Sequence, residues 1–355
     1  MRRFAVALVV AALAWGGVSS RAGASAASGV FPIAAGAHDQ SNAAISGNIV
    51  VWMDNSGGDL NVYGYDLTTG GAFPVSTAAG AQAFPSVSGE VVVWEDRRHG
   101  DPQYGGDVYG RDLSTNQEFV VYEDAGPILT AYRPAISGEW VVWSEYRAEA
   151  GGYGVYAFNL ASQQEKTLHV GGGESAIGLQ IGGDVAVWQE YAGDSQKNDV
   201  FGYDLAADAP LVVCDEPEYQ YDPNTDGKTV VWQDRRKGLA SDMDIYGLDL
   251  VTGVEFIIDA TTADTRDPAV AGDLVAWSAD GDLIGYRLST DQQFLIAADV
   301  SPQDIQISGN VIVWTSYDAA GGEFDVYGVR VVPEPSALVL LLAGAALCTA
   351  RRTSR

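Results

Sequence analysis

The residues best suited to chemistry or ligand binding in this chain stand in short polar loops, each in front of a recurring apolar segment. They mix carboxylates, guanidinium groups and phenols, a combination that suits recognition of a polar ligand or a sugar. The members of this set are Asp39, Tyr132, Arg133, Tyr221, Asp222, Arg266, Asp267 and Asp304. Paired carboxylates are also the groups with which glycosidases cleave polysaccharides. The competing interpretation is a set of solvated loop ends joined by local ion pairs.

One phrase is similar to the start of a calcium-binding loop. Asp222, Asn224 and Asp226 occupy alternate positions and Gly227 follows, which is the order of oxygen ligands and turn glycine in such loops. The twelfth position is Gln233 rather than glutamate, and no flanking helices are predicted. The phrase also aligns with an ordinary hairpin in other parts of the chain. Calcium is therefore the one cofactor that the sequence suggests, with the hairpin as the alternative.

Other familiar patterns of catalytic and metal-binding residues are missing from the sequence. The three histidines, His38, His99 and His169, are scattered and lack the spacing of a zinc site. The chain has no Gly-x-Ser-x-Gly phrase, which is typical of serine hydrolases. The sequence thus predicts no catalytic residues of these kinds.

A repeated phrase indicates how the polar loops are positioned. A glycine, a polar residue and three apolar residues precede a tryptophan, and the phrase ends at Trp52, Trp94, Trp143, Trp188, Trp232, Trp277 and Trp314. The intervals between these tryptophans are 42, 49, 45, 44, 45 and 37 residues. Seven copies at about 45 residues match the period of a four-stranded propeller blade.

Each copy contains three further strand-like segments. Residues 61–67 and 107–113 alternate apolar and polar side chains, which is typical of a half-buried strand. A short strand follows, as in residues 73–75, and another precedes the tryptophan phrase, as in residues 84–87. The sequence therefore predicts an all-β fold, a seven-bladed β-propeller with four-stranded blades over residues 29–331. The polar loops would then meet at the mouth of the central channel.

The seventh copy lacks an outer strand, because it runs directly into the C-terminal segment. The phrase Phe31-Pro32-Ile33 parallels Phe73-Pro74-Val75, which forms the outer strand of the first copy. We therefore predict that residues 30–34 complete the last blade. Such pairing closes the ring and removes two exposed sheet edges.

The repeated tryptophans stand in mid-strand beside valine and isoleucine, so we expect them in the core between blades rather than in a sugar-stacking set.

An acid opens the tyrosine-bearing strand in most copies. We expect the arginines of residues 96–98 and 234–236 to form ion pairs with such acids. The acids are Asp107, Asp199, Asp244 and Asp325.

The charge balance narrows the classes of partner. The whole chain has a net charge of −27, and residues 29–332 hold 14 basic against 46 acidic residues. A body this acidic repels phosphate backbones, so nucleic acid is excluded as a partner. Divalent cations, neutral sugars and basic partners remain possible ligands, and the alternative is that the negative charge serves only solubility.

Cys214 and Cys348 lie in different segments, so we expect no disulfide between them and a fold that relies on its core.

The N-terminal segment has the features of a secretory signal. Arg2 and Arg3 precede an apolar run over residues 4–15, and small-x-small sites follow at residues 22–24 and 24–26. We therefore predict a signal peptide over residues 1–26 and an exported protein.

The C-terminal segment, residues 332–355, has three parts in order. Pro333-Glu334-Pro335 comes first, residues 336–350 carry no charge, and an arginine-rich end follows. This order resembles the PEP-CTERM sorting signal of Gram-negative bacteria. The resemblance implies an exosortase-type membrane peptidase as partner, contact with the membrane through a C-terminal helix before processing, and a location in the cell envelope, at the cell surface or in the extracellular matrix. A plain anchor helix is the alternative.

The repeats resemble the TolB-type and WD40-like propeller families through their Pro-x-Val-Ser-Gly, Val-Val-Trp and Asp-Val-Tyr phrases, over about residues 30–331. The resemblance implies the fold and binding of a protein or glycan, and it carries no catalytic residues. Our leading hypothesis is a non-catalytic binding module. The alternatives are a polysaccharide lyase or glycosidase acting at the channel mouth, and a passive coat component.

Overall fold

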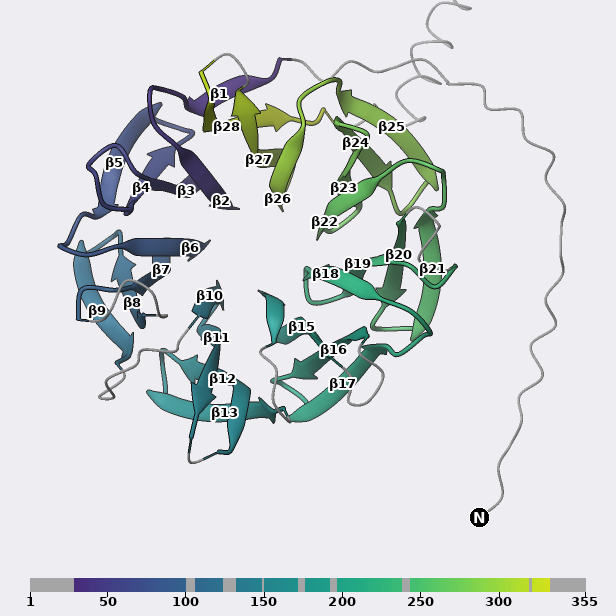
Figure 1. Ribbon diagram of the computed structural model, residues 1–355, viewed down its shortest axis with the longest axis horizontal. Coiled ribbons are helices and arrows are strands. Elements are labelled where there is room, and N and C mark those ends of the chain that lie inside the picture. The colour runs from purple at the N-terminus through teal and green to yellow at the C-terminus, as the bar shows by residue number, and fades with distance from the viewer. Residues whose placement is uncertain are drawn as a thin grey trace, which may run out of the picture.

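The computed structural model describes residues 29–99, 106–123, 132–148, 150–171, 176–191, 197–237, 243–318 and 321–332. Within these ranges the chain forms 28 strands and no helix, and the strands make seven four-stranded antiparallel sheets. The sheets stand as blades around a central axis, and the strand that precedes the tryptophan strand is innermost in each blade (Figure 1). The predicted seven-bladed, all-β propeller is confirmed.

Four strand positions repeat from blade to blade. The inner strands are β2 (Gln40–Ser46), β6 (Gln82–Ser88), β10 (Tyr132–Ser137), β14 (Ile177–Gly182), β18 (Gln220–Thr225), β22 (Thr265–Ala271) and β26 (Pro302–Ser308). The second strands are β3 (Ile49–Asp54), β7 (Val91–Asp96), β11 (Trp140–Arg147), β15 (Val185–Tyr191), β19 (Thr229–Asp234), β23 (Leu274–Ala279) and β27 (Val311–Asp318). The third strands are β4 (Asn61–Asp66), β8 (Asp107–Asp112), β12 (Gly152–Asn159), β16 (Asn198–Asp204), β20 (Asp244–Asp249), β24 (Asp282–Arg287) and β28 (Glu323–Arg330). The outer strands are β5 (Gly71–Ser76), β9 (Gln117–Tyr122), β13 (Gln164–Val170), β17 (Ala209–Cys214), β21 (Val254–Asp259), β25 (Gln292–Ala297) and, in blade 7, β1 (Phe31–Ala34).

The N-terminal strand closes the ring, as predicted. β1 pairs antiparallel with β28 and places Phe31 opposite Gly328, just as Phe73 of β5 lies opposite Gly64 in blade 1. In both pairs the phenyl ring covers the glycine, since a Cβ on Gly64 would lie 2.6 Å from the Phe73 ring and one on Gly328 would lie 3.0 Å from the Phe31 ring. The same contact that attaches an ordinary outer strand thus attaches the N-terminal one.

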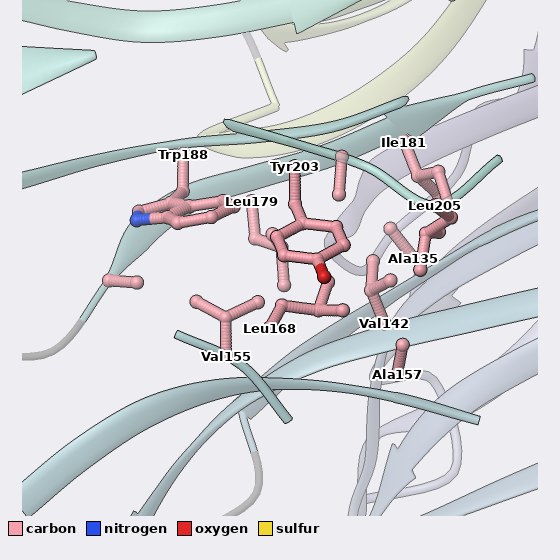
Figure 2. Close-up of a cluster of buried hydrophobic side chains, with 12 residues drawn as sticks. Ala135, Val142, Val155, Ala157, Leu168, Leu179, Ile181, Trp188, Tyr203 and Leu205 are labelled. Atoms are coloured by element: carbon pink, nitrogen blue, oxygen red, sulfur yellow. The ribbon is translucent and has the colours of Figure 1, made fainter. Parts of the chain in front are cut away.

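The repeated tryptophans form the core between blades, and the prediction for them is confirmed. Seven clusters of buried apolar side chains each contain one of these tryptophans together with residues of the preceding blade. Figure 2 shows the junction where Trp188 and Tyr203 of blade 4 face Val155 and Leu168 of blade 3. Burial of side chains this large is the main source of attraction between blades.

The arginines after the tryptophans have different partners from those expected. In blade 2 the indole N–H of Trp94 donates to Asp96 Oδ2 at 2.8 Å, and the guanidinium of Arg98 binds Asp96 at 2.7 Å and Glu118 at 2.8 Å. We expected Arg98 to pair with the acid that opens the third strand. It turns back instead because the carboxylate that accepts the buried indole N–H needs a counter-charge. Blade 5 repeats the arrangement with Trp232, Asp234, Arg236 and Glu255.

Candidate functional site at the channel mouth

Every inner strand contains one residue with a positive φ angle, at a bulge in its pairing with the second strand. We call these seven the rim residues: Asn42, Phe84, Arg133, Gly178, Asp222, Asp267 and Asp304, with φ from 45° to 64°. Glycine, asparagine and aspartate tolerate this conformation, whereas Phe84 and Arg133 adopt it under strain. Because the bulge occurs in all seven blades, it belongs to the architecture, and only the side chain differs between blades.

Neighbouring blades hold several of these bulges in place. The backbone N–H of a rim residue donates to the side chain that follows the tryptophan of the preceding blade. Arg133 N donates to Glu95 Oε2 at 3.3 Å, and Asp222 N donates to Gln189 Oε1 at 2.6 Å. The bulge therefore frees a donor that the preceding blade satisfies, which couples the shape of the rim to blade packing.

The rim residues line a cavity of about 190 Å³ at the mouth of the central channel. That volume has room for about six water molecules or for a group the size of a sugar ring. The residue after the rim position also contributes to the wall, for example Pro85, Pro134 and Pro268. The seven-fold arrangement thus places seven residues of five types around one small space.

Three adjacent blades contribute an aspartate to the rim. Burial raises the pKa of Asp267 to about 7, and the nearby charges of Asp222 and Asp304 add to the effect while Arg266 opposes it. Burial also raises the pKa of Asp222 and of Asp304, in each case against the positive charge of Arg133. Protein atoms surround these carboxyl groups on most sides, yet Asp222 stays exposed through the open mouth. Near neutral pH the trio can hold a proton or receive a cation.

Blades 2 and 3 contribute the contrasting side of the rim. The guanidinium of Arg133 lies 4.5 Å from the centre of the Phe84 ring, a cation–π contact. Its charge favours the ionised forms of Asp222 and Asp304, which lowers their pKa values against the effect of burial. The mouth therefore has an acidic side over blades 5 to 7 and a cationic, aromatic side over blades 2 and 3.

A groove of about 640 Å³ lies beside the cavity over blades 5 to 7, and the three rim aspartates line both spaces. Tyr221 and Arg266 also line the groove. Tyr221 stacks on Tyr219 with ring centres 5.7 Å apart and ring planes 2° from parallel, and Arg266 pairs with Asp264 at 2.6 Å. A ligand in the groove would thus reach the carboxylates and a flat aromatic surface together.

The structure brings most of the predicted residues together. Arg133, Asp222, Asp267 and Asp304 line the cavity, and Tyr221 and Arg266 line the groove. Tyr132 and Asp39 line neither of these two spaces. Asp39 accepts the backbone N–H of Phe324 at 3.0 Å and binds Asn55, so it connects β28 to the loop after β3.

Sequence reasoning missed three rim residues, Asn42, Phe84 and Gly178. Their position is the one before a proline in four of the repeats, at Pro85, Pro134, Pro223 and Pro268. Alignment of the copies on those prolines is the signal that would have found them.

The calcium-like phrase has a defined structural role. Asn224 Oδ1 accepts the backbone N–H of Val270 at 3.1 Å, and Asp226 Oδ2 accepts that of Gly272 at 2.8 Å, so both side chains bind blade 6. Asp226 Oδ1 also accepts the backbone N–H of Lys228 at 2.9 Å inside the hairpin. The hairpin interpretation describes this geometry, and calcium binding here stays a prediction.

The two terminal segments lie outside the described residues, and with them the predicted signal peptide and the sorting residues Pro333, Glu334 and Pro335. Within the described part of the chain, no helix has the length and apolar character needed to cross a bilayer.

Comparison with known proteins yields similarity at the level of structure. No family model matches the chain, and no match appears among curated proteins. An oligogalacturonate lyase from Vibrio parahaemolyticus superposes with a TM-score of 0.64 and 11% identity, over 88% of this chain and 96% of that chain. The β-propeller domain of the Trilobed protease from Pyrococcus furiosus gives 0.60 and 12%, over 84% and 94%. At such identities the likeness shows the fold alone.

One of these structures differs in how its ring ends. The Pyrococcus furiosus domain is described as having an open velcro topology, whereas here β1 pairs with β28 and completes blade 7. Our chain is thus a propeller of the same general fold, closed by its own N-terminal strand.

Proposed function

We propose that this protein is an exported binding module of the cell surface or extracellular matrix, which holds a protein or glycan ligand at the channel mouth without catalysing a reaction. The observation that carries the proposal is the rim, where Asp222, Asp267 and Asp304 face a cavity and a groove opposite Arg133. Seven-fold symmetry does not require acids at three adjacent positions, so their presence favours a ligand.

Among ligands of these classes, a glycan that carries amino groups matches the rim best. Three carboxylates outnumber the one guanidinium of the rim, so a cationic group would be drawn to the acidic side. The hydroxyl groups of a sugar can donate to carboxylate oxygens, and the stacked pair Tyr219 and Tyr221 offers a surface for a ring face.

The test is calorimetric titration of the full chain with glucosamine, N-acetylglucosamine and galacturonate oligosaccharides. We expect the glucosamine oligosaccharides to bind, and the triple variant Asp222→Asn, Asp267→Asn, Asp304→Asn to lose at least tenfold in affinity, since each charge-assisted hydrogen bond is strong. Asp39→Asn is the matched control, because Asp39 lies outside both spaces. Equal affinity in the triple variant and the parent would place the ligand elsewhere.

One observation favours an enzyme as the second candidate. An aspartic acid whose pKa lies at about 7, as for Asp267, has the property of a general acid, and Asp222 could act with it on a glycosidic bond. Incubation of the full chain with a polysaccharide panel, with and without calcium, distinguishes the two candidates. Product that disappears in Asp267→Asn would replace the binding proposal.

The location in this proposal rests on the terminal segments. In a Gram-negative host with an exosortase-type peptidase, we expect the mature chain to begin after residue 26 and to be cut near Pro333-Glu334-Pro335. Mass spectrometry of the released protein measures both ends. A protein whose C-terminus stays uncut, or unchanged processing of the Glu334→Ala variant, would support a plain anchor helix instead.

A further inference from the structure

A second group of chemically capable side chains lies on blade 2, outside the rim. His99 follows β7, Asp107 opens β8 and Glu123 follows β9. The pairing of Asp96 with Asp107 and of Val108 with Tyr122 brings these three strand ends to one edge of the sheet. Residues from separate segments therefore converge without being neighbours in sequence.

The two distances from the histidine nitrogen to the carboxylate oxygens match those of a tetrahedral metal site. His99 Nδ1 lies 3.3 Å from Asp107 Oδ2 and 3.2 Å from Glu123 Oε1, and the three ligand atoms all lie within 4.8 Å of one another. With zinc–ligand bonds of about 2.0–2.1 Å, two ligands of a tetrahedral ion are about 3.3 Å apart. One imidazole with two carboxylates is also a donor set that suits transition ions better than calcium or magnesium.

The surroundings favour a bound cation. Asp107 is fully buried, whereas the side chains of His99 and Glu123 are 52% and 51% exposed, which leaves a path for an ion and a place for water. Arg98, next to His99 in the sequence, binds Asp96 and Glu118. The hydroxyl of Tyr109 donates to Glu123 Oε1 at 3.4 Å and orients that carboxylate.

Blade 5 shows how the same position is built without a metal. Lys237, five residues after its tryptophan as His99 is, forms an ion pair of 2.7 Å with Asp244, the counterpart of Asp107. The counterpart of Glu123 is Ala260. Blade 2 thus replaces an ammonium group by an imidazole and adds a second carboxylate, which turns an ion pair into a site with room for a divalent charge.

We propose that blade 2 binds one divalent transition-metal ion, of the zinc class, through His99 Nδ1, Asp107 Oδ2 and Glu123 Oε1, with water as the fourth ligand. The ion would join the ends of three strands on the outer part of the blade. Because it would bind the folded chain only, it would also raise the thermal stability.

The test uses the full chain without a polyhistidine tag, titrated with Zn²⁺ by calorimetry and with Co²⁺ by visible absorption. We expect one equivalent to bind, with the absorption bands of tetrahedral cobalt. His99→Lys recreates the ion pair of blade 5, so the variant should fold normally and lose about 100-fold in zinc affinity. Glu123→Gln should lose about tenfold.

One control variant and one stability measurement decide whether the ion occupies this site. His169→Gln alters another histidine that faces a carboxylate, Glu190, at 2.9 Å. It should leave zinc affinity unchanged, and zinc should raise the melting temperature of this control and of the parent but not of His99→Lys. Absence of zinc binding to the parent chain, or unchanged affinity in both His99→Lys and Glu123→Gln, would overturn the proposal.

Discussion

The junctions between blades and the rim positions of the channel both recur seven times. What repeats at the junctions is a side chain, whereas what repeats at the rim is a backbone conformation. At the junctions the side chain is constant, because each blade places a tryptophan against the preceding blade. At the rim the backbone is constant, because each inner strand has a bulge with positive φ, while the side chains range from Gly178 and Phe84 to Arg133 and three aspartates.

The difference separates stability from recognition. A constant side chain indicates that the space between neighbouring blades is similar at every junction, so that a side chain of the same size fills it. A constant backbone with changing side chains provides a fixed frame on which chemistry can vary. We therefore expect substitutions at the junctions to act on the free energy of unfolding and substitutions at the rim to act on binding.

The largest effect should come from removing a junction tryptophan. Trp143 is fully buried and lies against Tyr122 of the preceding blade with ring centres 5.4 Å apart. Trp143→Ala should lower the free energy of unfolding by about 3–5 kcal/mol, because it leaves a large cavity. Chemical denaturation measures the loss. A cost no greater than that of Asp267→Asn would contradict the division between junction and rim.

The pH dependence of stability should come from the rim. Because burial raises the pKa of Asp267 to about 7 from 3.8, the folded state favours the neutral acid. Stability should therefore fall as the pH rises from about 4 to about 7 and stay level above that, while Asp267→Asn lacks this part of the fall. Unfolding curves of both proteins at pH 4 and pH 8 measure it, and parallel pH profiles would show an unperturbed Asp267.

Binding of a cationic ligand should change with pH in the opposite sense. The ionised carboxylate attracts the cation, so affinity for amino-bearing oligosaccharides should rise as the pH increases through 7, as long as the amine stays charged. Titration calorimetry at pH 5.5 and pH 7.5 measures the change. An affinity of the parent chain that does not change between these two pH values would show that Asp267 lies outside the binding site.

A smaller effect should distinguish two junctions. The indole N–H of Trp232 donates to Asp234 at 3.0 Å, whereas that of Trp277 has no acceptor among the described residues. Trp232→Phe should therefore cost about 1–2 kcal/mol more than Trp277→Phe, because only the first removes a hydrogen bond to a charged group. Denaturant titration of the two variants compares them, and equal costs would argue that the indole bond contributes little.

The smallest effect should come from the strained rim. Phe84 has a φ of 51°, and Asn42 occupies the same position in blade 1. Phe84→Asn should change the free energy of unfolding by less than about 1 kcal/mol, since relief of strain offsets the lost contact with Arg133. A loss as large as that of Trp143→Ala would mean that the rim side chains carry the packing after all.

Much of the fold could be predicted, because its signals are local and repeated. The tryptophan period predicted the blades, and the match of Phe31 to Phe73 predicted the closing strand, since each depends on a strand and its immediate partner. Ion-pair choice was less predictable. Arg98 binds the carboxylate that also accepts an indole proton, and a pattern of charges alone does not reveal that second requirement.

By itself, the sequence determined that this protein is a ring of seven like blades, because burial of one tryptophan per blade and of a phenyl ring in most outer strands leaves few other arrangements. Only the tertiary structure decided which side chains meet. Arg133 and Asp304 lie far apart along the chain, yet they line one cavity because the inner strands of all seven blades surround the same axis, and His99 meets Glu123 because two strand ends share an edge. Such meetings depend on the exact curvature and register of packed blades, which no short stretch of residues contains.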